Sequence, residues 1–308
     1  MLLEMRNVSS YYGSFLVLDN LSFTVDAGET VGLLGLPGSG KTTLMRLLSG
    51  FSIPNQGQVL LMGQSPSLPE GRRHFGYLPQ GNSLPKDMRV REYLYFRARL
   101  HGMGRSAARK AAAAAADYCG VQVNYDTLIG RLSRISRRRV GLADASLAKP
   151  ILLLLDEPTA GLEPEQAMEV RALIASLAAD SALFMASSFP QDVGELCRRV
   201  MALQLGRLLA DGATAAICEA NIEDRTLSIE LVADAPVKEA LRIIPGVKAI
   251  QVVPGAGQAL LVRLSTPAGV DLRREVMELC TRRGWLVSEM RLEPVKIDDI
   301  FRKLTRTG

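Results

Sequence analysis

One glycine-rich loop constrains the fold of this chain more than any other feature. An apolar segment at residues 30–34 leads into the loop, and apolar residues with helical spacing follow it at residues 41–49. The loop reads Gly35-Leu36-Pro37-Gly38-Ser39-Gly40-Lys41-Thr42. Glycines let backbone N–H groups converge on phosphates, and the N-terminus of the following helix adds partial positive charge. The order of strand, loop and helix therefore predicts a nucleotide-binding P-loop in a parallel α/β fold.

The residues at the end of this loop have distinct predicted roles. Lys41 is expected to reach the β- and γ-phosphates, and the hydroxyl of Thr42 is expected to ligate Mg²⁺. Thr43 is expected to hydrogen-bond a nearer phosphate. A glycine turn that only joins two elements would not explain a lysine and a threonine at this offset. The predicted nucleotide site comprises these three residues together with Gly35, Pro37, Gly38, Ser39 and Gly40.

A pair of acidic residues follows a second strand of the buried type. Residues 151–155 are all apolar and lead into Asp156-Glu157, and a third such strand is predicted at residues 182–187, after a helix around residues 167–179. Asp156 is expected to hold Mg²⁺ through water, and Glu157 to orient or deprotonate the attacking water. Acidic residues at a strand end are common, so this interpretation depends on the P-loop.

Further motifs fall in a characteristic order along the first two thirds of the chain. They are Tyr12-Gly13, Tyr77-Leu78-Pro79-Gln80 and Asp156-Glu157-Pro158-Thr159-Ala160-Gly161-Leu162. With the P-loop, they make residues 2–220 resemble the ATP-binding-cassette (ABC) family. The resemblance implies a cassette with a β-rich and a helical subdomain, ATP and Mg²⁺ as cofactors, Tyr12 stacking on adenine, and Gln80 sensing the γ-phosphate and Mg²⁺. Taken alone, Tyr12 could instead close a hairpin and Gln80 could be a solvated loop residue.

Three positions depart from the family pattern. The signature loop, Leu-Ser-Gly-Gly-Gln in the family, here reads Leu132-Ser133-Arg134-Ile135-Ser136. The resemblance assigns Ser133 to the partner's ATP, while the β-branched Ile135 replaces a glycine that approaches the partner's γ-phosphate and should obstruct it. Ser188 stands where the family has a switch histidine, and Glu163 where the D-loop has aspartate. We therefore expect ATP binding with reduced turnover.

The pattern of predicted elements changes near Ile222. We place a P-loop cassette at residues 1–222 and a smaller domain at residues 223–308. The second domain is predicted to have the order β-α-β-β-α-β, which indicates a ferredoxin-like α+β fold. Its segments are residues 226–232, 237–244, 249–253, 260–264, 272–283 and 286–292. It has no catalytic cluster, and we favour a dimer-stabilising or regulatory role over a ligand sensor.

Composition restricts where the chain is expected to act. Its apolar runs are shorter than the roughly 18 residues of a membrane helix, and the N-terminus lacks the features of a secretory signal. The formal charge of +5 is modest and spread through the chain, so nucleic acid is not an expected partner. The four cysteines lack metal-ligand spacing and are expected to be buried thiols. We expect a cytoplasmic protein, peripheral on the inner face of the membrane.

Two segments narrow the family resemblance. Residues 87–94 are similar to the helical region that faces the membrane subunit in multidrug, gliding-motility and copper-related exporters, and residues 296–304 resemble their tail motif. The leading hypothesis is an ATP-binding subunit of an ABC-2 type exporter, with separate transmembrane permease subunits and a second cassette, either itself or a related intact subunit. The alternatives are a non-hydrolysing, ATP-gated structural subunit and a non-transport ABC ATPase. The sequence names no cargo.

Two local expectations concern secondary structure alone. Residues 15–18 and 21–25 are predicted to form separate strands, because Asp19-Asn20 between them is prone to turns. The alanine-rich run at residues 111–116 is predicted to be an exposed helix, because alanine has high helix propensity.

Overall fold

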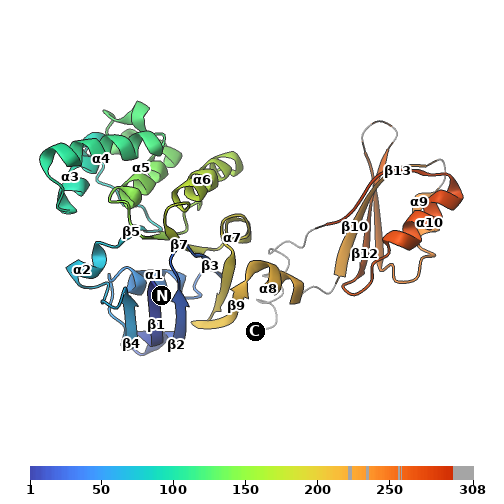
Figure 1. Ribbon diagram of the computed structural model, residues 1–308, viewed down its shortest axis with the longest axis horizontal. Helices are drawn as coiled ribbons and strands as arrows, with labels where there is room; N and C mark the ends of the chain where they lie inside the picture. Colours follow the sequence, from blue (N-terminus) through green and yellow to red (C-terminus); the bar gives the residue numbers. More distant parts are fainter. Residues whose placement is uncertain (221–223, 234–235, 256, 258, 294–308) are drawn as a thin grey trace. The chain divides into compact units, whose positions relative to one another are not determined.

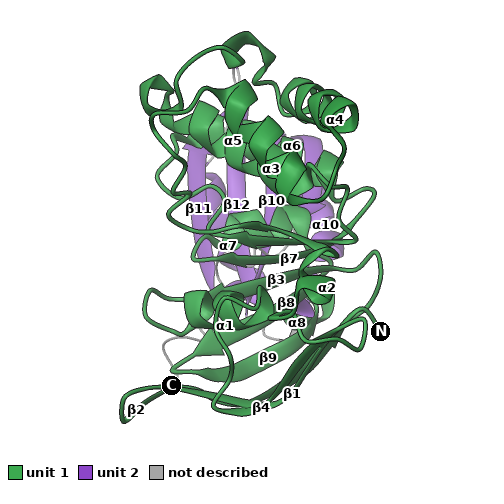
Figure 2. Ribbon diagram, turned by 90° about the vertical axis from the view of Figure 1, so that its left-hand side faces the viewer, with its two compact units in different colours: residues 1–217, 301–308 green, residues 218–300 purple. Residues whose placement is uncertain are grey.

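The computed structural model describes residues 1–220, 224–233, 236–255, 257 and 259–293 (Figure 1). These residues form two compact units, divided between Ile217 and Cys218 (Figure 2). The sequence-based boundary near Ile222 falls in a segment outside the described residues, as does the tail motif at residues 296–304. The domain limits therefore stay a prediction.

A six-stranded sheet forms the centre of unit 1. Its strand order is β5-β6-β7-β3-β8-β9, in which β9 is antiparallel to β8 and the other pairs are parallel. The strands are β3 (Thr30–Gly35), β5 (Phe75–Leu78), β6 (Leu152–Asp156), β7 (Ala182–Ser187), β8 (Arg199–Gln204) and β9 (Arg207–Ala213). Every residue of β6 and β7 is buried, as expected for parallel strands covered by helices. The predicted α/β fold class is confirmed.

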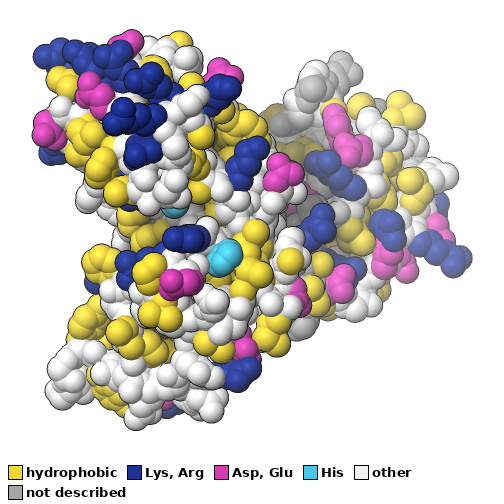
Figure 3. Space-filling view, turned by 60° about the vertical axis from the view of Figure 1, so that its left-hand side comes forward, with side chains coloured by type: hydrophobic (Ala, Val, Ile, Leu, Met, Phe, Trp, Pro, Cys, Tyr) yellow, Lys and Arg dark blue, Asp and Glu magenta, His cyan; other side chains and the backbone are white. Residues whose placement is uncertain are grey.

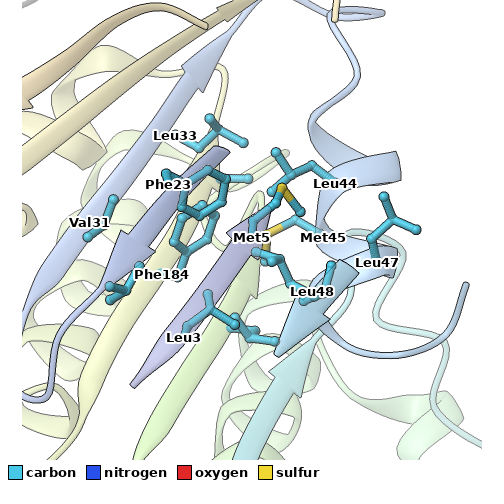
Figure 4. Close-up of a cluster of buried hydrophobic side chains, with 14 of the residues drawn as sticks. Leu3, Met5, Phe23, Val31, Leu33, Leu44, Met45, Leu47, Leu48 and Phe184 are labelled. Atoms are coloured by element: carbon cyan, nitrogen blue, oxygen red, sulfur yellow. The ribbon is translucent and has the colours of Figure 1, made fainter. Parts of the chain in front are cut away.

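Helix α1 (Lys41–Leu48) packs between this sheet and a second one. The second sheet is antiparallel with the order β2-β1-β4, formed by β1 (Leu3–Tyr12), β2 (Phe15–Val25) and β4 (Gln56–Leu61). Figure 4 shows side chains of α1 against Leu3 and Met5 of β1, beside the stacked rings of Phe23 and Phe184. Full burial of one such apolar side chain is worth about 1.5–3 kcal/mol. This packing fixes α1, and with it the loop that precedes α1.

Three helices form a separate layer of unit 1: α3 (Val90–Leu100), α4 (Arg105–Tyr118) and α5 (Arg134–Ser146). Asp144 of α5 accepts hydrogen bonds of 2.7 Å from the Tyr93 hydroxyl and from Arg97 Nε, both on α3. This layer carries many Lys and Arg side chains at the top of unit 1 (Figure 3). Unit 1 also contains α2 (Pro69–Arg72), α6 (Pro164–Leu177), α7 (Pro190–Leu196) and the two short 3-10 turns Gln122–Asn124 and Ile129–Arg131.

Two local predictions are wrong. The strand β2 is continuous through Asp19-Asn20. Asn20 adopts a left-handed φ of 48°, and its N–H donates to Ser9 Oγ of β1 at 3.0 Å. The pairing of β1 with β2 therefore shows a register shift at this point and no turn. The alanine-rich helix α4 is not exposed on all sides. Ala108, Ala112 and Ala116 are buried, since small side chains spaced four residues apart let neighbouring helices approach closely.

Unit 2 begins within α8 (Thr214–Ala220) and has its own core. Its elements are β10 (Asp224–Val232), α9 (Val237–Leu241), β11 (Ala249–Pro254), β12 (Leu260–Pro267), α10 (Arg273–Arg283) and β13 (Leu286–Leu292). The strands form one antiparallel sheet in the order β11-β12-β10-β13. Leu227, Ile229 and Leu264 of this sheet and Val276 of α10 are fully buried in one apolar cluster. The order β-α-β-β-α-β is that of a ferredoxin-like unit.

Within the part of the chain that the structure describes, no helix combines the length and the apolarity needed to cross a membrane.

Candidate functional site

Two glycines of the glycine-rich loop, Gly35 and Gly40, stand where another residue would clash or be strained. Gly35 ends β3, and a Cβ there would lie 2.3 Å from Ser39 Oγ. Gly40 precedes α1 with φ 106°, a value that other residues rarely adopt. No side chain caps the first turn of α1, so its N–H groups remain available to an anion. Leu36, Pro37 and Gly38 are exposed between these points.

Lys41 is buried, with 6% of its surface exposed, and its ammonium group is held by several oxygens. Lys41 Nζ donates to the carbonyls of Gly35 at 2.7 Å and Leu36 at 3.2 Å, and to Ser188 Oγ at 2.9 Å. It also lies 3.4 Å from a carboxylate oxygen of Glu157. The loop, β6 and the end of β7 therefore meet at this ammonium group.

Glu157 and Ser188 are joined directly. The Ser188 hydroxyl donates to Glu157 Oε1 at 2.6 Å, and the Ser188 N–H donates to Glu157 Oε2 at 3.0 Å. Glu157 has a left-handed φ of 50°, and its N–H donates to the Ala186 carbonyl at 2.8 Å. Such backbone strain costs about 1–3 kcal/mol and concentrates at functional sites. Ser188 thus lies next to both charged groups of the site.

Asp156 has the properties of a cation ligand. It is fully buried at the end of β6, and neither carboxylate oxygen has a hydrogen-bond partner. Burial raises its pKa to about 6, the charge of Glu157 adds to the shift, and Thr42, Lys41 and Arg46 oppose it. The Thr42 hydroxyl donates to the Gln80 side-chain carbonyl at 3.3 Å. These oxygen donors suit Mg²⁺, which prefers carboxylate, hydroxyl and carbonyl ligands.

Tyr12 lies at the end of β1, where the chain reverses into β2. It pairs in register with Phe15, its side chain is 55% exposed, and its hydroxyl accepts a hydrogen bond from Arg46 of α1 at 3.3 Å. The aromatic ring therefore closes a hairpin and is also accessible beside the helix that follows the P-loop. Both interpretations from the sequence are compatible with this position.

The signature residues lie on other elements. Ser133 caps α5, since its hydroxyl accepts a hydrogen bond from the Ser136 N–H at 3.2 Å. Ile135 is half-buried in the first turn of α5, and Glu163 is exposed at the cap position of α6. Among the described residues, none of these three side chains has a hydrogen bond or ion pair with the P-loop residues. A role toward an ATP held by another cassette stays a prediction.

The sequence reasoning missed a buried polar network beneath this site. Asp192 of α7 is 1% exposed and accepts hydrogen bonds from Ser187 Oγ at 2.9 Å and from the Thr159 hydroxyl. Arg171 of α6 lies 3.2 Å from the same carboxylate. Ser187 and Thr159 each lie two residues or fewer from Ser188 or Glu157. Thr159 belongs to the motif at residues 156–162, so its place near the site could be predicted from the sequence. Asp192 could not, because an aspartate in a short polar segment such as residues 190–196 is usually a surface residue.

Known proteins resemble this chain in sequence and in fold. The ABC transporter family model matches residues 18–160. Nod factor export ATP-binding protein I of Burkholderia lata is 32% identical over 308 residues, covering 98% of this chain and 96% of the relative. The protein of the same name from Burkholderia orbicola is 36% identical over 225 residues, covering 71% of this chain and 73% of the relative.

The chain belongs to the ABC transporter family. A solved ATP-binding subunit of an ABC transporter superposes with a TM-score of 0.64 at 26% identity, covering 71% of this chain and 93% of the other. A dimeric bacterial ABC transporter cassette gives a TM-score of 0.63, covering 68% and 98%, and at 20% identity it shows the fold alone. The predicted family and fold class are confirmed, and unit 1 is an ABC ATP-binding cassette. The roles of individual site residues stay predictions.

Proposed function

We propose that this chain is the ATP-binding subunit of an ABC-2 type exporter and that it hydrolyses ATP slowly. It would bind MgATP at a dimer interface, as a peripheral subunit on the cytoplasmic side of separate permease subunits. Its partner cassette would be a second copy or a related intact subunit. Similarity along almost the whole chain to proteins named for Nod factor export supports a role in export.

The arrangement of Lys41, Glu157 and Ser188 carries the proposal. A lysine at the P-loop and a carboxylate 3.4 Å away are the groups needed to bind a triphosphate and to activate water. Serine has a single hydroxyl proton, and Ser188 donates it to Glu157 at 2.6 Å. No side-chain donor of Ser188 then remains for the transferring phosphoryl group, so binding is retained and catalysis is weakened.

The remaining site residues have roles that follow from their contacts. Thr42, Asp156 and Gln80 would hold Mg²⁺, which neutralises charge on phosphate oxygens. The free N–H groups of the loop and of the first turn of α1 would bind phosphate oxygens. Tyr12, held by Arg46 and exposed, would stack on the adenine ring.

Ile135 and Ser188 would affect different ATP sites of a head-to-tail dimer. Each site in such a dimer combines the P-loop and switch residue of one cassette with the signature loop of the other. With an intact partner, one site would contain Ser188 and the other would face Ile135. In a homodimer both sites would contain both changes. Loss of one positioned donor costs about 100- to 1,000-fold in rate, so a homodimer should hydrolyse ATP very slowly.

Phosphate release by the purified chain tests this proposal. We expect the wild-type rate to lie well below about 1 per second, the lower end of usual enzyme turnover. Ser188→His should raise the rate, and Ser188→His with Ile135→Gly should raise it further. Glu157→Gln is the control and should abolish release in every background while ATP binding persists.

Two results would contradict the proposal. One is a wild-type rate already at or above about 1 per second, typical of working enzymes. The other is a double variant that folds and binds ATP but hydrolyses no faster than the wild type. The second result would favour the alternative of a non-hydrolysing, ATP-gated subunit.

The exporter assignment has its own test. Co-expression with a permease encoded beside this chain should move the chain from the soluble to the membrane fraction, and phosphate release should increase. A chain that stays soluble with every neighbouring permease, or that sediments with ribosomes or DNA, would instead support a non-transport ABC ATPase.

A further inference from the structure

A cavity of about 400 Å³ lies between the loop after β5 and the start of α5. Asn82, Ser83 and Lys86 line it from the loop, and Arg134, Arg137 and Arg138 line it from the helix. Four of its lining side chains are cationic and none is acidic. None of the residues assigned above to ATP or Mg²⁺ lines the cavity, and its volume lies within the usual range for small-molecule sites.

Arg138 gives the cavity a buried donor without a partner. Its side chain is 6% exposed, and its Nη1 is fully buried with no hydrogen-bond partner. The other terminal nitrogen, Nη2, makes one long bond of 3.4 Å to the Ala160 carbonyl. A buried, unpaired guanidinium donor is costly, so such groups are normally satisfied by an anion or by ordered water.

The cationic groups are not neutralised by the protein. Among the described residues, Lys86, Arg134, Arg137 and Arg138 form no ion pair. Burial lowers the pKa of Arg138, while Asp156 and Glu157 attract its charge without contacting it. Arg139, the next residue on α5, differs from them because it forms an ion pair of 2.6 Å with Glu169.

The walls of the cavity are held in place. Asn82 Nδ2 donates to the Arg137 carbonyl at 2.7 Å, which ties the loop to the first turns of α5. Gly141 lets this approach happen, since a Cβ there would lie 2.4 Å from Asn82 Oδ1. Arg134 donates to the Gly161 carbonyl on the far side. The backbone of the cavity walls and the Arg134 side chain are therefore held by the fold.

We propose that this cavity is a second anion site, separate from the P-loop, which binds a small molecule bearing phosphate groups. Arginine side chains match the geometry of both phosphate and carboxylate oxygens. A single carboxylate would leave most of the four cations without a counter-charge, whereas a phosphate dianion or a diphosphate would neutralise more of them. The site does not rest on the proposed export function.

Calorimetric titration of the full chain tests this proposal. A non-hydrolysable MgATP analogue is added first to saturation, so that the P-loop is filled, and inorganic phosphate, pyrophosphate or glycerol phosphate is then titrated. We expect saturable binding of at least one of these probes at one site per chain. Preference for glycerol phosphate would identify an ester ligand, and preference for phosphate or pyrophosphate a free ion.

Variants connect the binding to the cavity. Arg137→Gln combined with Lys86→Gln should weaken the probe at least tenfold, and so should Arg138→Lys, which keeps the charge but loses the forked donors. Arg139→Gln, which removes a paired charge one residue away, should change the affinity by less than twofold. Equal affinity of all variants for the MgATP analogue shows that they are folded.

Three results would overturn the proposal. The first is the absence of saturable binding for every probe up to concentrations well above about 1 mM, the weak end of specific binding. The second is an equal loss of binding in Arg139→Gln and in the cavity variants, which would indicate general charge attraction. The third is binding of a glutamate-rich peptide but of no phosphate probe, which would make the site a protein-docking site.

Discussion

Asp156 and Glu157 are adjacent carboxylates in very different environments. Glu157 accepts two hydrogen bonds from Ser188 and lies near Lys41, whereas both oxygens of Asp156 are buried without a partner. Neighbouring carboxylates whose environments differ in this way can take separate chemical roles. The paired, oriented carboxylate suits a water-activating residue, and the unpaired one suits a metal ligand.

The raised pKa of Asp156 predicts how stability depends on pH. The folded chain holds this proton more tightly than the unfolded chain, so its contribution favours folding below about pH 4 and is lost as pH rises through about 6. In EDTA without nucleotide, Asp156→Asn should therefore increase the free energy of unfolding at pH 7.5 by up to about 3 kcal/mol. The gain should vanish near pH 4. Urea denaturation at a series of pH values measures it.

Asp271→Asn provides the control for this experiment. Hydrogen bonds from Arg273 lower the pKa of Asp271 to about 2, so its contribution to stability has the opposite sign and is lost as pH falls from about 4. This variant should not be stabilised at pH 7.5. If Asp156→Asn were equally stable or less stable than the wild type at pH 7.5, the attraction of Thr42, Lys41 and Arg46 for the carboxylate would outweigh the effect of its burial.

At the scale of elements, the polar network under the site links α6, α7 and β7. Arg171 comes from α6, Asp192 from α7 and Ser187 from the end of β7, directly before Ser188. Thr159 joins the same carboxylate from the segment after Glu157. Among the described residues, α6 and α7 form no hydrogen bond or ion pair with Lys41, yet they support the segments that carry Glu157 and Ser188.

Removing Asp192 should destabilise the cassette strongly. Asp192→Ala removes the buried one of the two carboxylates that pair with Arg171 and leaves the Ser187 and Thr159 hydroxyls without their acceptor. Breaking a buried pair costs up to about 3–5 kcal/mol. Glu195→Gln is the matched control, because Glu195 pairs with the same Arg171 at 2.6 Å but its side chain is 47% exposed. The control should cost under about 1 kcal/mol. Equal losses in urea denaturation would mean that the buried carboxylate has no special role.

Elements with a strong local signal could be predicted from the sequence. The strands before Asp156 and Ser188 are runs of apolar residues, and glycines mark the P-loop, so Lys41, Asp156 and Glu157 were assigned to strand ends and a helix start. Asp192 and Arg138 could not be found in this way, because their burial depends on contacts between residues far apart in the chain. The prediction of a turn at Asp19-Asn20 was wrong for a related reason, because pairing of β2 with the distant strand β1 overrides the local turn preference.

At the scale of the whole molecule, the two units have separate cores. The apolar cluster around α1 contains only residues from unit 1, and the cluster around Leu227 and Val276 contains only residues from unit 2. A unit with its own core can fold independently, and its removal need not expose the core of the other. The change in the order of predicted strands and helices near Ile222 indicates this division, and the exact domain boundary stays a prediction.

Truncation after Ala220 tests the independence of the cassette. We expect the shortened chain to fold and to bind ATP within about threefold of the full-length affinity, less than about 1 kcal/mol, because Lys41, Thr42 and Asp156 all lie in unit 1. If residues 223–308 stabilise a dimer, the shortened chain should also dimerise more weakly in analytical ultracentrifugation with ATP present. A truncated chain that does not fold would mean that the units share essential contacts. A truncated chain that folds and dimerises as strongly as the full chain would leave the C-terminal unit free for a regulatory role, because dimerisation would then reside in the cassette alone.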